Sequence, residues 1–310
     1  MSTAIYTKNT KESNSWRIVL QEELPDQTIE VYPSIADYND VEFLICWKPY
    51  HGLIAQFPNL KAIQSLGAGV DHIFDANTID AHIQVSKIVD DQLTQDMWEH
   101  TLSIVMADMK NFAFFKDKQQ NRTWKPRRYK RIKDIKIGIL GLGTIGKYVA
   151  TQFETLGFQV TGWSRSTKSL PNIMTYMGQE GINQVCSNSD YLINILPLTI
   201  ETKGIMNKGV FVYMKPSSYF INVGRGSHVV DNDLIECLDN EILRGAALDV
   251  FQIEPLSDDH PFWSHLKILI TPHIASLTNI ESVYPQVIEN IRRLDSGLPL
   301  LNLIDVGKGY

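Results

Sequence analysis

Cysteine is scarce in this sequence, and long apolar runs are missing. Among 310 residues there are three cysteines, Cys46, Cys186 and Cys237, and they lie far apart. Such spacing gives neither a C-x-x-C motif nor a disulfide framework, which excludes a small disulfide-stabilised secreted protein and favours a reducing compartment. No run approaches the roughly 18 consecutive apolar residues of a membrane span, and the polar N-terminus lacks the apolar core of a signal peptide. We therefore expect a cytoplasmic protein that does not bind membranes.

Low-complexity segments, internal repeats and an excess of basic charge are missing as well. Glycine (19 residues) and proline (13 residues) occur at ordinary levels. Lysine and arginine number 29 against 35 aspartates and glutamates, which gives a net charge of −6. A dedicated nucleic-acid-binding domain is usually basic, so no nucleic-acid partner is expected. At roughly 100–200 residues per domain, the length predicts two domains or one large α/β unit.

In the first half of the chain, short apolar segments alternate with polar or helical ones. The segments that we predict as strands are 16–20, 29–32, 41–47, 60–66 and 83–86. This alternation is typical of βαβ units and predicts a parallel sheet. Apolar residues then recur near helical spacing over residues 92–118, with no proline among them, which predicts one long helix.

The second half shows the alternation more clearly. A strand is predicted at 136–141 and a helix at 144–156, and the further predicted strands are 159–163, 191–196, 219–223, 245–250 and 267–271. Six strands with helical crossovers are typical of a doubly wound sheet. The predicted fold class is therefore α/β, with two doubly wound parallel-sheet domains, the second a Rossmann dinucleotide-binding domain. A last helix, about residues 280–296, is expected to return to the first domain.

A basic stretch, WKPRRYKRIKDIK at residues 124–136, separates the two halves. It has two interpretations, a solvated surface arm and an anion or nucleic-acid patch. The acidic charge of the whole chain favours the surface arm. Residues 125–136 receive no functional role.

Three glycines form a G-x-G-x-x-G motif. Gly141, Gly143 and Gly146 follow directly after a predicted strand and open a predicted helix, the context that the motif requires. The first glycine permits a tight turn, the second lets the backbone approach a pyrophosphate, and the third lets helix and strand pack closely. The unpaired N–H groups of the helix N-terminus then face the phosphates. A dinucleotide site is favoured over a purely structural glycine turn.

The next predicted strand ends without an acidic residue. An NAD site carries Asp or Glu about 20 residues after the glycine motif to hold the ribose hydroxyls, yet none occurs between Val160 and Leu170. The polar side chains found there are those of Ser164, Arg165, Ser166 and Lys168. An arginine fork and hydroxyl donors suit a 2′-phosphate, so NADP(H) is the predicted cofactor, with NAD(H) as a weaker possibility. The alternative is a solvated surface loop.

Three polar groups follow late strands of the second half, where ligands of open α/β sheets collect. They are Arg225, Glu254 and His273. Taken singly, each has a structural interpretation, as a surface ion pair, a solvated loop carboxylate and a buried turn histidine.

Together with their motifs, these residues resemble the D-isomer-specific 2-hydroxyacid dehydrogenase family. The matching motifs, in the family's order, are GLGTIG (141–146), LPLTIETKGIM (196–206), INVGRGSHVVDNDL (221–234), GAALDVFQIEPL (245–256) and TPHIAS (271–276). The sequence is most similar to the glyoxylate/hydroxypyruvate reductase A branch. The segments that carry this closer likeness are SLGAGVD (65–71), WKP (124–126), Cys46-Trp47, WSRS (163–166) and the final Gly309-Tyr310.

The resemblance implies a catalytic triad of Arg225, Glu254 and His273. A permanently charged arginine can engage both oxygens of a 2-oxoacid carboxylate, and a histidine can give its proton to the nascent alkoxide. A carboxylate on the other ring nitrogen would orient that histidine and favour its protonated form. The implied domains are a flavodoxin-like substrate-binding domain, 1–100 plus 281–310, and an NAD(P)-binding Rossmann domain, 101–280.

The resemblance also implies the binding residues. The cofactor would be bound by Gly141, Gly143, Thr144, Ile145, Gly146, Ser164, Arg165, Ser166, Lys168, Leu196, Pro197, Val223, Gly224, Arg225, Asp249, His273 and Ala275. The substrate would be bound by Trp47, Ala68, Gly69, Arg225 and His273. Asp249 would meet the nicotinamide amide, and Ala275 stands where glycine is more usual in the family. Successive N–H groups of residues 67–70 suit a carboxylate, although a simple strand-to-helix turn would look the same. No metal is expected.

The expected function is NADPH-preferring reduction of small 2-oxoacids, glyoxylate to glycolate and hydroxypyruvate to D-glycerate, by a homodimer. One alternative is an NAD-dependent D-2-hydroxyacid dehydrogenase acting on another substrate. A second is a dinucleotide-sensing corepressor, which uses the same fold as a binding module and can keep the triad. The chain shows no obvious disordered flanks for recruiting partners, which favours an enzyme.

Overall fold

The computed structural model describes residues 2–74 and 78–305. Gly309 and Tyr310, part of the likeness above, lie outside the described residues. The chain divides into two compact units, one made of Met1–Leu93 and Thr278–Tyr310, the other of Thr94–Leu277. The boundaries at 100/101 and 280/281 stay a prediction for the functional domains. Within residues 2–74 and 78–305, no helix is both long and apolar enough to cross a lipid bilayer.

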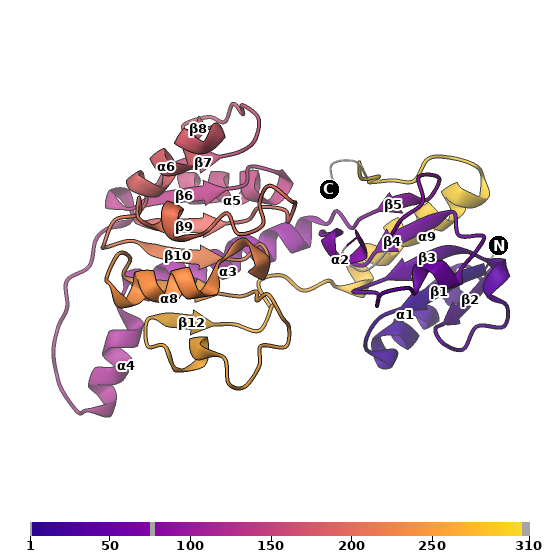
Figure 1. Ribbon diagram of the computed structural model, residues 1–310, viewed down its shortest axis with the longest axis horizontal. Coiled ribbons are helices and arrows are strands. Elements are labelled where there is room, and N and C mark those ends of the chain that lie inside the picture. Colours follow the sequence, from indigo (N-terminus) through magenta and orange to yellow (C-terminus); the bar gives the residue numbers. More distant parts are fainter. Residues whose placement is uncertain (1, 75–77, 306–310) are drawn as a thin grey trace. The chain divides into compact units, whose positions relative to one another are not determined.

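The first unit is built on a five-stranded parallel sheet (Figure 1). Its strands are β1 (Ser2–Tyr6), β2 (Thr28–Val31), β3 (Val41–Cys46), β4 (Ala62–Ser65) and β5 (Gln84–Ser86), in the order β2-β1-β3-β4-β5. This is the flavodoxin-like order, which reverses between β1 and β3. Helices α1 (Thr10–Glu23) and α9 (Ile280–Asp295) pack on one face. The other face is covered by α2 (Asp71–Phe74) and by residues 53–60, which include the short helix η2 (Ile54–Gln56).

The prediction of a strand at 16–20 is wrong, because this segment lies within α1. Trp16 and Leu20 are buried and four residues apart, while Ile18 between them is 53% exposed, which is the pattern of one helix face rather than of a strand. The Asn9 side chain caps the helix by accepting a hydrogen bond from the N–H of Lys11. Strand β1 was not predicted, because it begins with the polar residues Ser2 and Thr3 although nearly all of it is buried.

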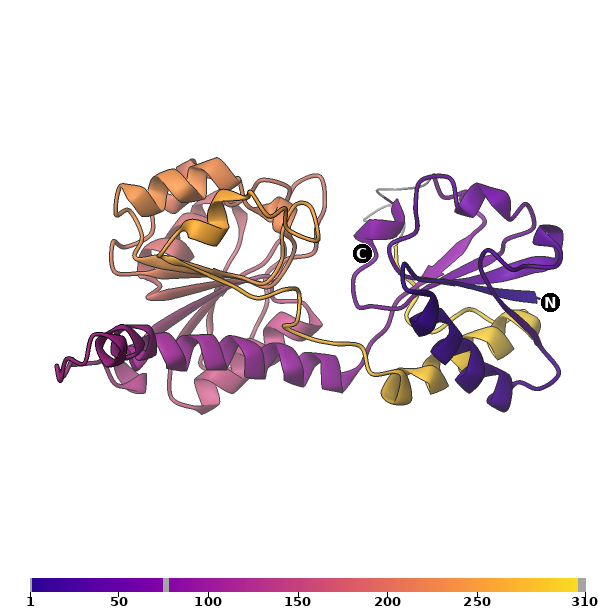
Figure 2. The same ribbon diagram turned by 90° about the horizontal axis from the view of Figure 1, so that it is seen from below.

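The second unit is built on a seven-stranded parallel sheet. Its strands are β6 (Lys136–Leu140), β7 (Gln159–Trp163), β8 (Met174–Tyr176), β9 (Tyr191–Asn194), β10 (Tyr219–Asn222), β11 (Gly245–Leu248) and β12 (Ile268–Ile270), in the order β12-β11-β10-β9-β6-β7-β8. Figure 2 shows helices on both faces. Helices α3 (Asp91–Met109) and α5 (Thr144–Thr155) cover one face, and α6 (Gly178–Asn188), α7 (Lys208–Phe211) and α8 (Asp231–Asp239) the other. The predicted fold class, two doubly wound parallel-sheet domains, is confirmed.

Two details of this unit differ from the prediction. The segment 92–118 is not one helix, because Asn111 adopts a left-handed conformation (φ 60°) between α3 and α4 (Phe112–Gln120). Asparagine tolerates that conformation better than most residues, so no proline or glycine was needed to end the helix. The edge strand β8 was missed because it is short and only partly buried.

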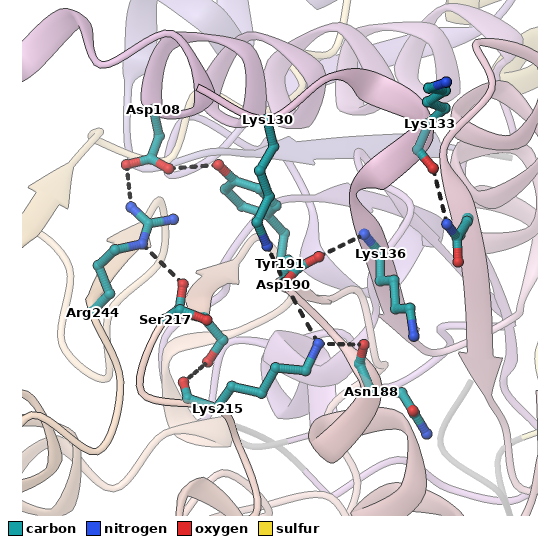
Figure 3. A network of polar contacts seen from close by, with 12 residues as sticks. Asp108, Lys130, Lys133, Lys136, Asn188, Asp190, Tyr191, Lys215, Ser217 and Arg244 are labelled. Carbon is teal, nitrogen blue, oxygen red and sulfur yellow. Dashed lines mark hydrogen bonds and ion pairs between the residues drawn. The ribbon is translucent and has the colours of Figure 1, made fainter. Parts of the chain in front are cut away.

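A polar network fastens α3 and the basic stretch to the strands of the second unit (Figure 3). The Asp108 carboxylate accepts hydrogen bonds of 2.6 Å from the Tyr191 hydroxyl and from Arg244 Nη1. The Asp190 carboxylate accepts the N–H of Lys136 at 2.9 Å and lies 3.3 Å from Lys130 Nζ. The basic stretch therefore follows the unit as an exposed arm that is fixed to the sheet by an ion pair.

Candidate functional site

The glycine motif lies where the strand order of the second sheet reverses. β6 has β7 on one side and β9 on the other, and ligands of doubly wound folds bind outside the carboxyl ends of the strands at such a point. Residues 141–143 connect the carboxyl end of β6 to the start of α5. The first turn of α5 is consequently free to offer its N–H groups at this edge.

The structure gives a different reason for glycine at each position of the motif. Gly141 has φ +104°, a conformation that L side chains rarely adopt, and its backbone packs against Ile195. A Cβ at Gly146 would lie 1.8 Å from the Gly141 carbonyl oxygen, so the closeness of α5 and β6 depends on this glycine. A Cβ at Gly143 would meet nothing within 4 Å. The structure therefore leaves open space at the helix N-terminus, as a pyrophosphate requires.

The segment after β7 presents Arg165 and Ser166 as exposed residues, with Lys168 partly buried. The Ser164 hydroxyl is buried and donates to the Ser166 carbonyl oxygen at 2.7 Å, which closes the turn. The fold brings an acid near this segment that the sequence did not reveal. A hydrogen bond with Thr199, a backbone hydrogen bond and the positive charge of Arg165 together hold the pKa of Glu201 below its ordinary value.

His273 and Glu254 are in direct contact. His273 Nδ1 lies 2.7 Å from Glu254 Oε2, and the other carboxylate oxygen accepts the N–H of Phe251 at 3.1 Å. Both side chains are mostly shielded, at 30% and 19% exposed. A carboxylate bound at Nδ1 fixes the ring orientation and leaves Nε2 as the nitrogen that can deliver a proton.

Asp249 holds the segment that carries His273. Its carboxylate accepts the Thr271 hydroxyl at 2.6 Å and the N–H groups of Ile274 and Ala275 at 2.9 Å each, while its carbonyl oxygen accepts the N–H of His273 at 2.8 Å. These bonds support His273 in a left-handed conformation, with φ +56°. Ala275 contributes its backbone N–H to this set of bonds.

The loop that carries Arg225 packs against the loop that carries Glu254. A Cβ at Gly226 would lie 1.8 Å from the backbone carbon of Phe251, and Gln252 Nε2 donates to the Val229 carbonyl oxygen at 3.1 Å. Arg225 Nη1 donates to the Gly224 carbonyl oxygen at 2.8 Å. Arg225, Glu254 and His273 thus come from three loops at the same edge of one sheet that contact one another.

Four further polar residues lie around these loops and were not predicted from the sequence. Asn194 and Asn222 end the buried strands β9 and β10, and His228 follows Arg225; none of the three has exposed area. An asparagine at the end of two successive apolar strands was a readable signal. His100 on α3 has its Nε2 3.9 Å from Asp249, and burial lowers the pKa of His100 although the Asp249 charge opposes this.

Three of the predicted substrate residues lie together in the first unit. Trp47 follows β3, and its ring is so close to the turn after β4 that a Cβ at Gly67 would lie 2.4 Å from it. The Ser65 hydroxyl accepts the N–H of Gly67 and donates to the Gly69 carbonyl oxygen, which closes the turn. Neither Ala68 nor Gly69 donates its N–H to an acceptor within residues 2–74 and 78–305. The turn thus keeps the N–H groups that an anion nest would use.

Sequence comparison places the chain in a family. Residues 102–275 match the NAD-binding domain of D-isomer-specific 2-hydroxyacid dehydrogenases. The chain belongs to this family. It is therefore an NAD(P)-dependent dehydrogenase with a Rossmann domain.

The similar proteins extend over nearly the whole chain. A protein named glyoxylate/hydroxypyruvate reductase A from Serratia proteamaculans is 35% identical over 303 residues, which cover 96% of both chains. A family member from Xanthobacter autotrophicus Py2, crystallised with NADPH and MES, superposes with a TM-score of 0.92 at 32% identity and covers 100% of this chain and 99% of its own. An NADPH-dependent glyoxylate/hydroxypyruvate reductase from Sinorhizobium meliloti, crystallised with NADP and sulfate, gives 0.90 at 30% identity and covers 100% of both chains.

Proposed function

We propose that this protein reduces small 2-oxoacids with NADPH, glyoxylate to glycolate and hydroxypyruvate to D-glycerate. The observation that carries the proposal is the 2.7 Å contact between His273 and Glu254, on loops that pack against the loop of Arg225. This arrangement supplies a charged anchor and an oriented proton donor, which the reduction of a 2-oxoacid needs. The names of the reductases similar to this chain support the same substrates.

Each residue of the triad has a separate task. Arg225 binds the substrate carboxylate through its planar fork and polarises the neighbouring carbonyl group. NADPH, when bound, supplies the hydride that reaches the keto carbon. His273 gives the proton from Nε2 to the keto oxygen, so that the carbonyl becomes a secondary alcohol or, from glyoxylate, a primary one. Glu254 balances the positive charge of His273 and keeps its ring in place.

The residues at the point where the strand order of the second sheet reverses fit a dinucleotide that carries a 2′-phosphate. The open space at Gly143 and the free first turn of α5 suit the pyrophosphate, and Arg165 with Ser166 and Lys168 suits the 2′-phosphate. NADP(H) is accordingly the proposed cofactor, and the solved relatives with bound NADPH or NADP support it. The remaining cofactor residues are those predicted from the sequence.

Trp47, Ala68 and Gly69 are proposed to contact the substrate. The N–H groups of Ala68 and Gly69, which have no acceptor within residues 2–74 and 78–305, suit a carboxylate, and the Trp47 ring suits the wall of a small pocket. A hydrophobic wall discriminates by about 1–3 kcal/mol per methylene group, so Trp47 would favour small 2-oxoacids without strictly excluding larger ones. A homodimer is also proposed, and a cytoplasmic location stays a prediction from the sequence.

The proposal is tested by NADPH oxidation with a panel of 2-oxoacids, namely glyoxylate, hydroxypyruvate, pyruvate and phenylpyruvate, repeated with NADH. We expect the highest kcat/KM for glyoxylate or hydroxypyruvate with NADPH. His265→Gln, which alters a histidine outside the described loops, is the matched control for His273→Gln. Tight NADPH binding without turnover of any 2-oxoacid would instead favour the dinucleotide-sensing module, and preference for NADH would favour the other dehydrogenases of the family.

A further inference from the structure

Beneath the active-site loops of the second unit lies a closed polar cluster of Asn194, Asn222 and His228. None of the three side chains has exposed area. Asn194 and Asn222 are paired neighbours at the carboxyl ends of β9 and β10, and His228 belongs to the short helix η4 (Gly226–His228). Burying polar groups costs free energy unless they are hydrogen-bonded. The hydrogen bonds of this cluster therefore show which backbone groups it fixes in place.

The bonds of His228 fix its protonation. Its Nδ1 lies 2.9 Å from Asn194 Nδ2 and accepts the backbone N–H of Arg225 at 3.1 Å. Since Nδ1 is an acceptor, the ring is neutral and its proton is on Nε2. Nε2 in turn lies 3.2 Å from the carbonyl oxygen of Pro197, to which it donates. One imidazole thus holds two loops, each through a different nitrogen.

The two asparagines complete the connection. Asn222 Oδ1 accepts from Asn194 Nδ2 at 2.9 Å and from the N–H of Gly224 at 3.2 Å, while its Nδ2 donates to the Arg225 carbonyl oxygen at 3.0 Å. Asn194 Oδ1 accepts the N–H of Leu196 at 3.3 Å. The cluster packs tightly against Gly224, where a Cβ would lie 3.0 Å from His228 Nδ1. The N–H group and the carbonyl oxygen of Arg225 are therefore both hydrogen-bonded to the cluster.

We propose that His228 is a positioning residue that fixes the substrate anchor Arg225 through Nδ1 and the cofactor loop at Pro197 through Nε2. The proposal rests on the proposed function, in which Arg225 binds the substrate carboxylate and residues 196–197 contact the dinucleotide. His228 itself takes no part in proton transfer, because it is sealed from the reacting groups and both of its nitrogens are engaged. Its effect is to set the position of one binding group relative to the other.

Two substitutions of His228 test the hydrogen bonds of Nδ1 and Nε2 separately. In His228→Asn, the new Oδ1 takes the place of Nδ1 and can accept the Arg225 N–H, but nothing reaches Pro197. In His228→Gln, the side-chain amide takes the place of Nε2 and can donate to Pro197, but the Arg225 N–H loses its acceptor. A buried polar group that loses its hydrogen-bond partner changes a binding equilibrium that depends on it by about tenfold or more.

The expected result is a crossed pattern. We expect His228→Asn to raise the NADPH dissociation constant about tenfold and leave the KM for glyoxylate within about twofold, and His228→Gln to do the reverse. NADPH binding is measured by its fluorescence and KM by steady-state kinetics at saturating NADPH. The control is His265→Gln, since His265 Nδ1 also accepts a backbone N–H, that of Lys267, at 3.2 Å. It should change neither constant.

Other outcomes overturn the proposal. If both constants change together in both variants, or neither changes, His228 has only a structural role. If the wild-type enzyme reduces none of the 2-oxoacids, the proposed function fails; the NADPH dissociation constants, and the binding of oxalate to the NADPH complex, still test the positioning role.

A measurement on the wild-type chain covers the case in which a variant does not fold. ¹⁵N spectra of histidine-labelled protein should show one ring, protected from solvent exchange, that stays neutral with its proton on Nε2 between about pH 6 and 9, a range in which an ordinary histidine titrates. His228 is the fully buried histidine of the described residues. A protected ring with its proton on Nδ1, or one that becomes charged in this range, would contradict the assignment.

Discussion

At the scale of single residues, the side chains proposed for catalysis are restricted by their neighbours. His273 is oriented by Glu254, its segment is held by Asp249, and its backbone lies in a conformation that few residues other than glycine adopt. Arg165, in contrast, is exposed, and the role proposed for it depends on its charge. The two kinds of residue lead to different tests.

For His273, we expect the alanine variant to lose roughly 10²–10⁴-fold in kcat, the range for general acid–base catalysis, while NADPH binding is retained. Glu254→Gln should lower kcat less, because the ring keeps a hydrogen-bond partner but loses the opposing charge. Stopped-flow measurement of NADPH oxidation by the wild type and both variants checks this, and near-normal turnover of His273→Ala would refute the assignment.

For Arg165, alanine should raise the KM for NADPH about tenfold, the lower part of the range for a charge-assisted contact because water screens this exposed site. The KM for NADH, which lacks the 2′-phosphate, should change little. Arg292→Ala on α9, which removes an exposed arginine of the first unit, is the charge-matched control. Equal losses with both cofactors would contradict the prediction that Arg165 binds the 2′-phosphate.

At the scale of elements, the junction of β6 and α5 depends on two glycines for different reasons. Gly146→Ala should separate helix and strand, lowering the melting temperature and NADPH affinity together, because the new Cβ would overlap the Gly141 carbonyl group. Gly143→Ala should leave the melting temperature nearly unchanged and weaken NADPH binding alone, because its Cβ enters open space. Thermal unfolding and NADPH titration of both variants check these two predictions. An equal loss of stability in both variants would contradict them.

Asp190 gives the second prediction at this scale. Burial alone would raise the pKa of Asp190, but the hydrogen bond from Lys136 and the charges of Lys215 and Lys130 outweigh it and hold the pKa below 3.8. A lowered pKa means that Asp190 stabilises the fold fully above about pH 4 and loses this effect as the pH falls below that value. We expect Asp190→Asn to be less stable than the wild type at pH 6, with the difference shrinking towards pH 3. Urea unfolding at both pH values checks it, and a difference independent of pH would exclude the charge as the cause.

Most of the elements could be predicted from the sequence, and the failures have physical causes. Strands such as Tyr219–Asn222 are buried on both faces, so their apolar runs are continuous and easy to recognise. The run 16–20 is equally apolar, but only Trp16 and Leu20 reach the core, and periodicity cannot distinguish a short run of this kind from a strand.

The candidate site was predicted less completely than the fold. Its charged side chains lie in motifs and could be read from the sequence. Their supports could not, because the bonds from His228 to Pro197 and from Asp249 to Ala275 join residues far apart in the chain. The nearness of Glu201 to Arg165 likewise arises only when β7 and the loop after β9 meet at the same edge of the sheet.

At the scale of the whole molecule, the second unit exposes three large aromatic side chains between residues 112 and 129 that the proposed homodimer would cover. Phe112 on α4 is 62% exposed, Tyr129 57% and Trp124 in the arm 99%. Exposed aromatic residues in one region are typical of interfaces. We expect the wild type to have twice the mass of one chain in light scattering, and Phe112→Ser combined with Trp124→Ser to have the mass of one chain with unchanged circular dichroism. A wild type with the mass of one chain would remove the dimer from the proposal.

The first unit is made from both ends of the chain, and this determines when it can be completed during synthesis. Helix α9 supplies Val283, Val287 and Ile291 to its core, and the N–H of Ile304 bonds to the Val85 carbonyl oxygen beside β5. These residues leave the ribosome after the continuous second unit. The nascent protein can therefore acquire its Rossmann domain while the N-terminal sheet still lacks one covering helix, so the apolar face formed by Ile5, Phe43 and Ile45 stays open until α9 has been synthesised.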